Sequence, residues 1–145
     1  MNASVAPTCS FQGQVGQEYY YISCNGESYH CKADHRVPNE HKGIWDISRP
    51  EECHVFCDAD NDPDGIHVGS ERWFISASDV IGTNGERLAR FLGPGVPGAT
   101  WHGFPVGGRR RRAREAFPSE ALVKKWRDDA VIDRALESKI NRRTI

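Results

Sequence analysis

The stretch that decides the fold is EYYYISCNGESYHCK, residues 18–32. Aromatic and β-branched residues lie on both sides of Asn25-Gly26, and the central residues of a tight hairpin turn need the positive φ that Asn and Gly tolerate best. We therefore predict a β-hairpin over residues 19–32. In that register Tyr20 lies opposite Cys31, which places Cys24 and Cys31 about 13 Å apart along the ladder.

Residues 24–71 hold four of the five cysteines and five of the six histidines. The chain starts without the basic and apolar segments of an export signal, and its cysteine count is odd, so we expect thiols or metal ligands rather than a disulfide framework. Two zinc ligands must each lie about 2.3 Å from the ion, which a regular hairpin does not allow for Cys24 and Cys31. The hairpin therefore disfavours a zinc site made of Cys24, Cys31, Cys53 and Cys57.

The string Asp34-His35-Arg36-Val37-Pro38 follows the hairpin. These few residues resemble the opening of the HNH endonuclease motif. The resemblance implies that His35 acts as a general base and that Asp34 helps to hold a divalent metal ion. The alternative is a polar strand end before Pro38.

Residues 53–76 alternate between polar and apolar side chains and predict a second hairpin, whose turn is Asp60-Asn-Asp-Pro-Asp-Gly65. The sequence from Asp60 onward also matches the pattern of an EF-hand calcium loop, in which Glu71 occupies the twelfth position. The β-like residues around it favour the hairpin. A weak calcium or magnesium site is the alternative use of the acidic cluster, which consists of Asp58, Asp60, Asp62 and Asp64.

Asn84 can cap a short helix that ends at Leu92, before a Gly-Pro pair. Residues 93–108 predict a Gly/Pro-rich loop that folds back over the sheet, because it carries Trp101 and other apolar residues that must be buried. His102 in this loop is a candidate catalytic residue at a pocket rim. The alternative is a structural histidine.

Two short amphipathic helices are predicted beyond Pro118. Ser119 caps the first, and Asp128-Asp129 marks the break before the second. The apolar residues that would face the core are Leu122 and Trp126 in the first helix and Ile132, Leu136 and Ile140 in the second.

Charge is distributed unevenly along the chain. Residues 1–108 contain 7 Lys and Arg against 14 Asp and Glu, whereas residues 109–145 contain 12 against 6. An arginine run opens the basic part, and such a run is stabilised by an anionic partner or by the acidic part of the same chain. We expect partner or nucleic-acid contacts there, made by Arg109, Arg110, Arg111, Arg112, Arg114, Lys124 and Lys125.

Together these patterns predict an α+β protein with antiparallel hairpins in the N-terminal half and helices in the C-terminal third. We expect a flexible arm over residues 1–17 and a single domain over 18–145. Within that domain, residues 18–80 are β-rich and acidic, 84–108 hold the short helix and loop, and 109–145 form the basic helical segment. No window approaches a membrane span, so we expect a soluble, cytoplasmic protein without a membrane partner.

Two classes of function remain. The first is a small intracellular binding protein that contacts a protein or a nucleic acid through its basic segment and its acidic β-rich face. The alternative is a metal-dependent nuclease or toxin-like hydrolase centred on Asp34, His35 and the carboxylates of residues 58–64. No cofactor is firmly implied, and calcium, magnesium and zinc are the candidate ions.

Overall fold

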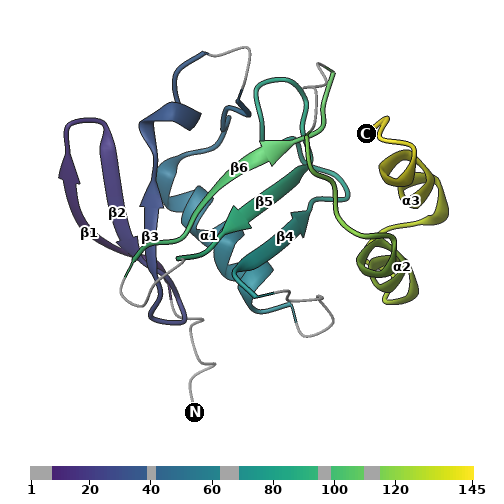
Figure 1. The fold of residues 1–145 in the computed structure, drawn as a ribbon, viewed down its shortest axis with the longest axis horizontal. Coiled ribbons are helices and arrows are strands. Elements are labelled where there is room, and N and C mark those ends of the chain that lie inside the picture. Colours follow the sequence, from purple (N-terminus) through teal and green to yellow (C-terminus); the bar gives the residue numbers. More distant parts are fainter. Residues whose placement is uncertain (1–7, 39–41, 63–68, 95–98, 110–114) are drawn as a thin grey trace.

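The computed structural model describes residues 8–38, 42–62, 69–94, 99–109 and 115–145 and confirms the α+β class (Figure 1). Two three-stranded antiparallel sheets are followed by two helices at the C-terminal end, and a third helix lies between the sheets in the sequence. The elements in chain order are β1 (Ser10–Val15), β2 (Glu18–Ile22), β3 (Ser28–Cys31), the 3-10 helix η1 (Ala33–His35), α1 (Arg49–Asp60), β4 (Glu71–Ile75), β5 (Leu88–Leu92), β6 (His102–Val106), α2 (Glu120–Asp128) and α3 (Arg134–Asn141).

The predicted hairpin is present as β2 and β3, but its register is one residue away from the prediction. Tyr19, not Tyr20, pairs with Cys31. The reason is a longer turn: the amide of Ser23 donates to the carbonyl of Glu27 at 2.7 Å, so that five residues connect the strands instead of two. The hydroxyl of Ser23 accepts the amides of Asn25 and Glu27, which stabilises this wider turn.

Strand β1 occupies a segment for which the sequence predicted no element. It pairs antiparallel with β2, and its register shifts between Phe11 and Gly13. Nearly all of its residues are exposed, so both faces of the strand contact solvent. The sequence of such a strand does not need to alternate between polar and apolar residues. The expectation of a loose arm is therefore wrong for Ser10–Val15.

Helix α1 replaces the first strand of the second predicted hairpin, and that prediction is wrong. Ser48 caps the helix, because its hydroxyl accepts the Glu51 amide at 3.2 Å and donates to the Glu51 carboxylate at 2.9 Å. Pro50 stands in the first turn, where its missing N–H costs nothing. The helix precedes the EF-hand-like string, but strand β4 follows it instead of a second helix.

Strands β5 and β6 occupy the segments predicted as a helix and a loop, so both predictions are wrong. Asn84 belongs to a turn rather than a helix cap: Gly85 has a φ of +84°, and the Ile81 amide bonds to the Glu86 carbonyl at 2.8 Å. The chain then runs antiparallel to β4 as β5 and returns as β6. Burial of Trp101 agrees with the expectation that this segment packs over the sheet.

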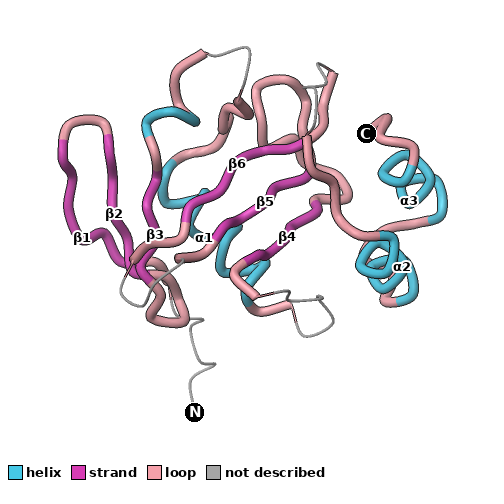
Figure 2. The backbone as a smooth tube through the Cα atoms, viewed as in Figure 1, coloured by secondary structure: helices cyan, strands magenta, loops and turns pink. Residues whose placement is uncertain are grey.

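The two sheets meet where β3 runs parallel to the start of β6, so the six strands lie in the order β1-β2-β3-β6-β5-β4 (Figure 2). The His30 amide donates to the Trp101 carbonyl and the Trp101 amide to the Ser28 carbonyl, both at 2.8 Å. Helix α1 lies behind the strands, and α2 and α3 lie beyond β4 (Figure 1). This arrangement makes two hydrophobic cores, one on each side of β5.

The first core lies between α1 and the strands and includes Tyr29, Phe56, Phe91 and Trp101. The second lies between β4–β6 and the two C-terminal helices and includes Trp73, Leu88, Val106, Trp126, Leu136 and Ile140. Both C-terminal helices are confirmed. Ser119 and Asp133 cap them by accepting the Leu122 and Leu136 amides at 3.2 and 2.8 Å.

A buried polar network ties α1 to the first sheet. Glu52 is 1 % exposed, and its carboxylate accepts the Tyr29 hydroxyl and the Arg36 guanidinium, both at 2.6 Å. Burial outweighs these favourable partners and raises the pKa of Glu52 to about 7. The first core is therefore organised around one carboxyl group.

Candidate functional site

Three cysteines from distant parts of the chain come together at the N-terminal sheet. Cys53 and Cys57 lie one turn apart on α1 and are both buried, and Cys9 reaches them from the residue before β1. Their sulfur atoms all lie within 4.8 Å of one another, so the cluster can hold a metal ion. Cys9 and Cys53 form a disulfide bond, and the sulfur of Cys57 lies 3.6 Å from that of Cys9.

Cys24 joins this group through the turn between β2 and β3. Its amide donates to the sulfur of Cys57 at 3.0 Å, and the side-chain amide of Asn61 donates to the sulfur of Cys24 at 3.4 Å. Asn25 fixes the same turn by donating to Asp60 and Asn61 at 2.9 and 2.8 Å. The turn of the first hairpin is therefore docked on the C-terminal end of α1.

The set of gathered cysteines differs from the set considered in the sequence. Cys31 is buried elsewhere, with its thiol 3.8 Å from the Arg49 carbonyl, and Cys9 takes its place. The expectation of thiols without disulfides is wrong for Cys9 and Cys53. Sequence analysis missed Cys9 because only the pairing of β1 with β2 brings it to α1.

Burial controls the ionisation of the Cys57 thiol. It raises the pKa of Cys57 to about 12, and the neighbouring Cys24 thiol adds to this effect. Cys57 is therefore a neutral thiol near pH 7 unless a cation compensates its charge.

The two residues of the HNH-like string make different contacts. His35 is buried, its Nδ1 lies 2.9 Å from the Gly43 carbonyl, and its ring stacks on Phe104 with the centroids 5.2 Å apart. Asp34 lies on the surface, where its ion pair with Lys42 at 2.6 Å lowers the pKa of its carboxyl group. Burial lowers the pKa of His35, so its imidazole is neutral near pH 7.

His102 lies on β6 and faces away from α1, because the preceding Trp101 packs on Phe56 of that helix. Burial lowers the pKa of His102 to about 4, and the nearby Lys32, His35 and His30 shift it in the same direction. Both candidate catalytic histidines lie on the same face of β6, because His35 stacks on Phe104, two residues along the strand from His102. A third histidine, His30, was not a candidate in the sequence. The alternation of buried and partly buried residues along β3 could have identified it, and its ring stacks on Tyr20 and lies 3.3 Å from the Glu18 carboxylate.

The carboxylates of the acidic cluster at the end of α1 accept hydrogen bonds from other side chains of the same chain. Asp60 accepts Arg72 Nε at 3.0 Å as well as the Asn25 amide, and Asp62 accepts the indole N–H of Trp126 at 3.2 Å. Burial raises the pKa of Asp58. These three carboxylates do not form a ligand group within 4.8 Å in the described part of the chain, and Asp64 lies outside it.

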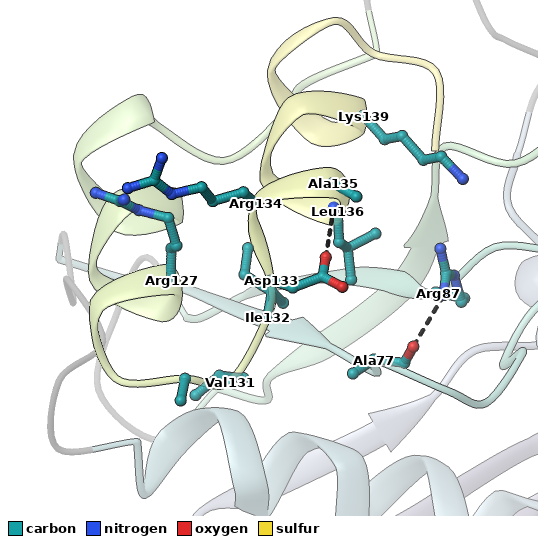
Figure 3. A pocket seen from close by; sticks show the side chains of 11 residues that line it. Ala77, Arg87, Arg127, Val131, Ile132, Asp133, Arg134, Ala135, Leu136 and Lys139 are labelled. Atoms are coloured by element: carbon teal, nitrogen blue, oxygen red, sulfur yellow. Dashed lines mark hydrogen bonds between the residues drawn. The ribbon is translucent and has the colours of Figure 1, made fainter.

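A pocket of about 650 Å³ lies between the turn joining α2 to α3 and the β4–β5 connection. Apolar residues, among them Ile132 and Leu136, line it together with four cations. In Figure 3, Lys139 and Arg87 extend toward each other on one side, and Arg127 and Arg134 lie together on the other.

Three acidic groups beside this pocket already have partners. Asp133 caps α3, and Asp128 and Glu137 both pair with Arg127, at 3.2 and 3.3 Å. Arg87 donates to the Ala77 carbonyl at 2.9 Å, a neutral acceptor. Among the residues that the structure describes, no carboxylate lies within ion-pair distance of Arg87, Arg134 or Lys139.

The expected basic binding residues are only partly described. Arg109 is exposed, and its Nη1 lies 3.5 Å from the position that a Cβ on Gly85 would occupy, two residues before Arg87. Lys124 and Lys125 are exposed on α2 and do not line the pocket. Arg110, Arg111, Arg112 and Arg114 lie outside the described residues.

Within the described ranges, we find no helix with the length and apolar character needed to cross a membrane. The chain matches no protein family, no curated protein and no solved structure.

Proposed function

We propose that the protein binds the phosphate backbone of a nucleic acid through a cationic surface. This cationic surface consists of Arg87, Arg109, Arg134 and Lys139. The observation that carries the proposal is that three of these cations line one pocket without a carboxylate partner among the described residues. A phosphate group would supply the missing negative charge.

The position of Arg109, the first residue of the arginine run, supports the same surface. Residues 109–114 contain five arginines, and the first of them lies against the turn that leads to Arg87. Residues 115–145 contain seven Lys and Arg against six Asp and Glu, so the C-terminal helices alone are nearly neutral. Binding to an anionic polymer therefore depends on the arginine run and on the pocket cations rather than on the helices as a whole.

The test is fluorescence anisotropy with labelled single-stranded and duplex oligonucleotides over a range of salt concentrations. Each phosphate contact contributes about 0.7 to 0.9 to the slope of log K against log salt. We expect the double variant Arg134→Gln/Lys139→Gln to weaken binding and to reduce this slope by between one and two.

Two control variants make the result specific. Lys42→Gln removes a positive charge that is paired with Asp34 and does not line the pocket, and it should leave the slope unchanged. Lys124→Gln/Lys125→Gln removes two cations outside the pocket and should have a smaller effect than the pocket variant. Salt-independent binding, or no binding to either kind of oligonucleotide, would leave an acidic protein as the partner and overturn the proposal.

A further inference from the structure

Three of the five cysteines, Cys9, Cys53 and Cys57, have sulfur atoms within 4.8 Å of one another, and a fourth, Cys24, lies beside Cys57 on a separate segment. Cys53 and Cys57 come from one face of α1, Cys9 from the start of β1, and Cys24 from the β2–β3 turn. Such a group is more than a disulfide bond requires, because the Cys57 sulfur lies 3.6 Å from that of Cys9 and the turn that carries Cys24 contacts Cys57 in turn.

The spacing of the Cys9, Cys53 and Cys57 sulfur atoms suits three corners of a tetrahedral metal site. Four thiolates at about 2.3 Å from a zinc ion lie about 3.8 Å from one another. The sulfurs of Cys9 and Cys57 are 3.6 Å apart, and the Cα atoms of Cys9 and Cys53 are 6.2 Å apart, so side-chain rotation can separate the bonded sulfurs without a large backbone shift. All four donors are sulfur, which selects zinc over calcium or magnesium.

The surroundings supply the contacts that a zinc-thiolate centre needs. The Cys24 amide donates to the Cys57 sulfur at 3.0 Å, and the Asn61 side chain donates to the Cys24 sulfur at 3.4 Å. Hydrogen bonds of this kind orient metal ligands and reduce the negative charge on thiolates. Asn25 holds the turn that carries Cys24 against the end of α1, so the segment of the fourth ligand is held beside the other three cysteines, and rotation of the Cys24 side chain completes the site.

We propose that the reduced protein binds one Zn²⁺ through Cys9, Cys24, Cys53 and Cys57. The disulfide in the structure is the metal-free alternative of the same site. A dithiol reductant converts it by breaking the Cys9–Cys53 bond: its two thiols become a disulfide, and two electrons and two protons pass to Cys9 and Cys53. Zinc then forms four Zn–S bonds, and the four thiol protons leave to solvent.

The first experiment uses the wild-type chain, purified with a reductant and without a chelator. Elemental analysis should give one zinc per chain, and Co²⁺ exchanged into the site should show the visible absorption bands of tetrahedral thiolate coordination. Four thiols should react with Ellman's reagent only after a chelator removes the metal. Reduced protein that takes up neither zinc nor Co²⁺, or a Co²⁺ spectrum of octahedral coordination, would overturn the proposal.

Variants then test the ligand set against a matched control within the chain. Cys24→Ser and Cys57→Ser should lose stoichiometric zinc, whereas Cys31→Ser, which removes the buried cysteine near the Arg49 carbonyl, should retain one zinc per chain. If Cys24→Ser retains zinc with an unchanged Co²⁺ spectrum, or if Cys31→Ser loses the metal, the four-cysteine assignment is wrong. The wild-type measurements remain decisive should a serine variant fail to fold.

Discussion

Glu52 makes the stability of this protein depend on pH in a way that a single substitution should remove. The folded state raises the pKa of this buried carboxyl group from its ordinary value near 4.5 to about 7. A raised pKa means that the folded protein holds the proton more tightly than the unfolded chain does. The stabilising contribution is therefore complete below about pH 4.5 and is lost as the pH rises through 7.

The size of the change in stability follows from the two pKa values of Glu52. A rise from 4.5 to about 7 corresponds to about 3 kcal/mol in the free energy of unfolding. Glu52→Gln keeps the shape of the side chain and stays neutral at every pH, so it imitates the protonated form. We expect the difference in the free energy of unfolding between the variant and the wild type to change by about 3 kcal/mol in favour of the variant between pH 4 and pH 8.

Urea denaturation of both proteins at intervals across this pH range measures the difference directly. Glu27→Gln is the matched control, because Glu27 is exposed in the β2–β3 turn and its substitution should leave the pH dependence of the wild type intact. Other titrating groups contribute equally to both proteins and cancel in the difference. A difference that stays constant from pH 4 to pH 8 would refute the assignment of this pH dependence to Glu52.

His102 should make the protein labile to acid, because its pKa is lowered to about 4 and the neutral imidazole is favoured by folding. Its stabilising contribution is present above the ordinary pKa of histidine and is lost as the pH falls toward 4, so His102→Asn should flatten the acid side of a melting-temperature profile; an unchanged profile would contradict this role. Gly103→Ala should destabilise the fold by about 1–3 kcal/mol in chemical denaturation, because its Cβ would lie 2.1 Å from Cδ1 of the fully buried Phe91. Gly13→Ala is the control, since no atom lies within 4 Å of its Cβ position, and equal effects of the two substitutions would show that the close contact at Gly103 is not limiting.

The parts of the fold that the sequence predicted well are those with a local signal. The hairpin around Asn25-Gly26 was predicted from its turn residues, although its turn length and register were not, and helices α2 and α3 have caps and an apolar face that agree with one another. The strand prediction for α1 failed because alternate residues of its second half are apolar, a pattern that a helix of this length also permits. The Ser48 cap and Pro50 were the opposing signals, and they were local as well.

Strand β5 shows why other elements were unpredictable. Ala89 and Phe91 face the first core and Leu88 faces the second, so both sides of the strand are buried and no alternation remains to distinguish it from a short helix.

The candidate sites depended still more on tertiary structure. The cysteine cluster needs Cys9, which comes to α1 only through strand pairing, and the pocket needs Arg87 to meet Lys139 across the second core. His35 and His102 were identified as candidates in the sequence, but their proximity follows from β3 lying beside β6.

The position of β5 between two cores also has a consequence for cooperativity. The same five-residue strand supplies side chains to both cores. If the packing of one core is lost, β5 is displaced, and the other core loses the side chains that this strand contributes. The halves of the molecule on either side of this strand should consequently melt together, in a single calorimetric transition rather than in two.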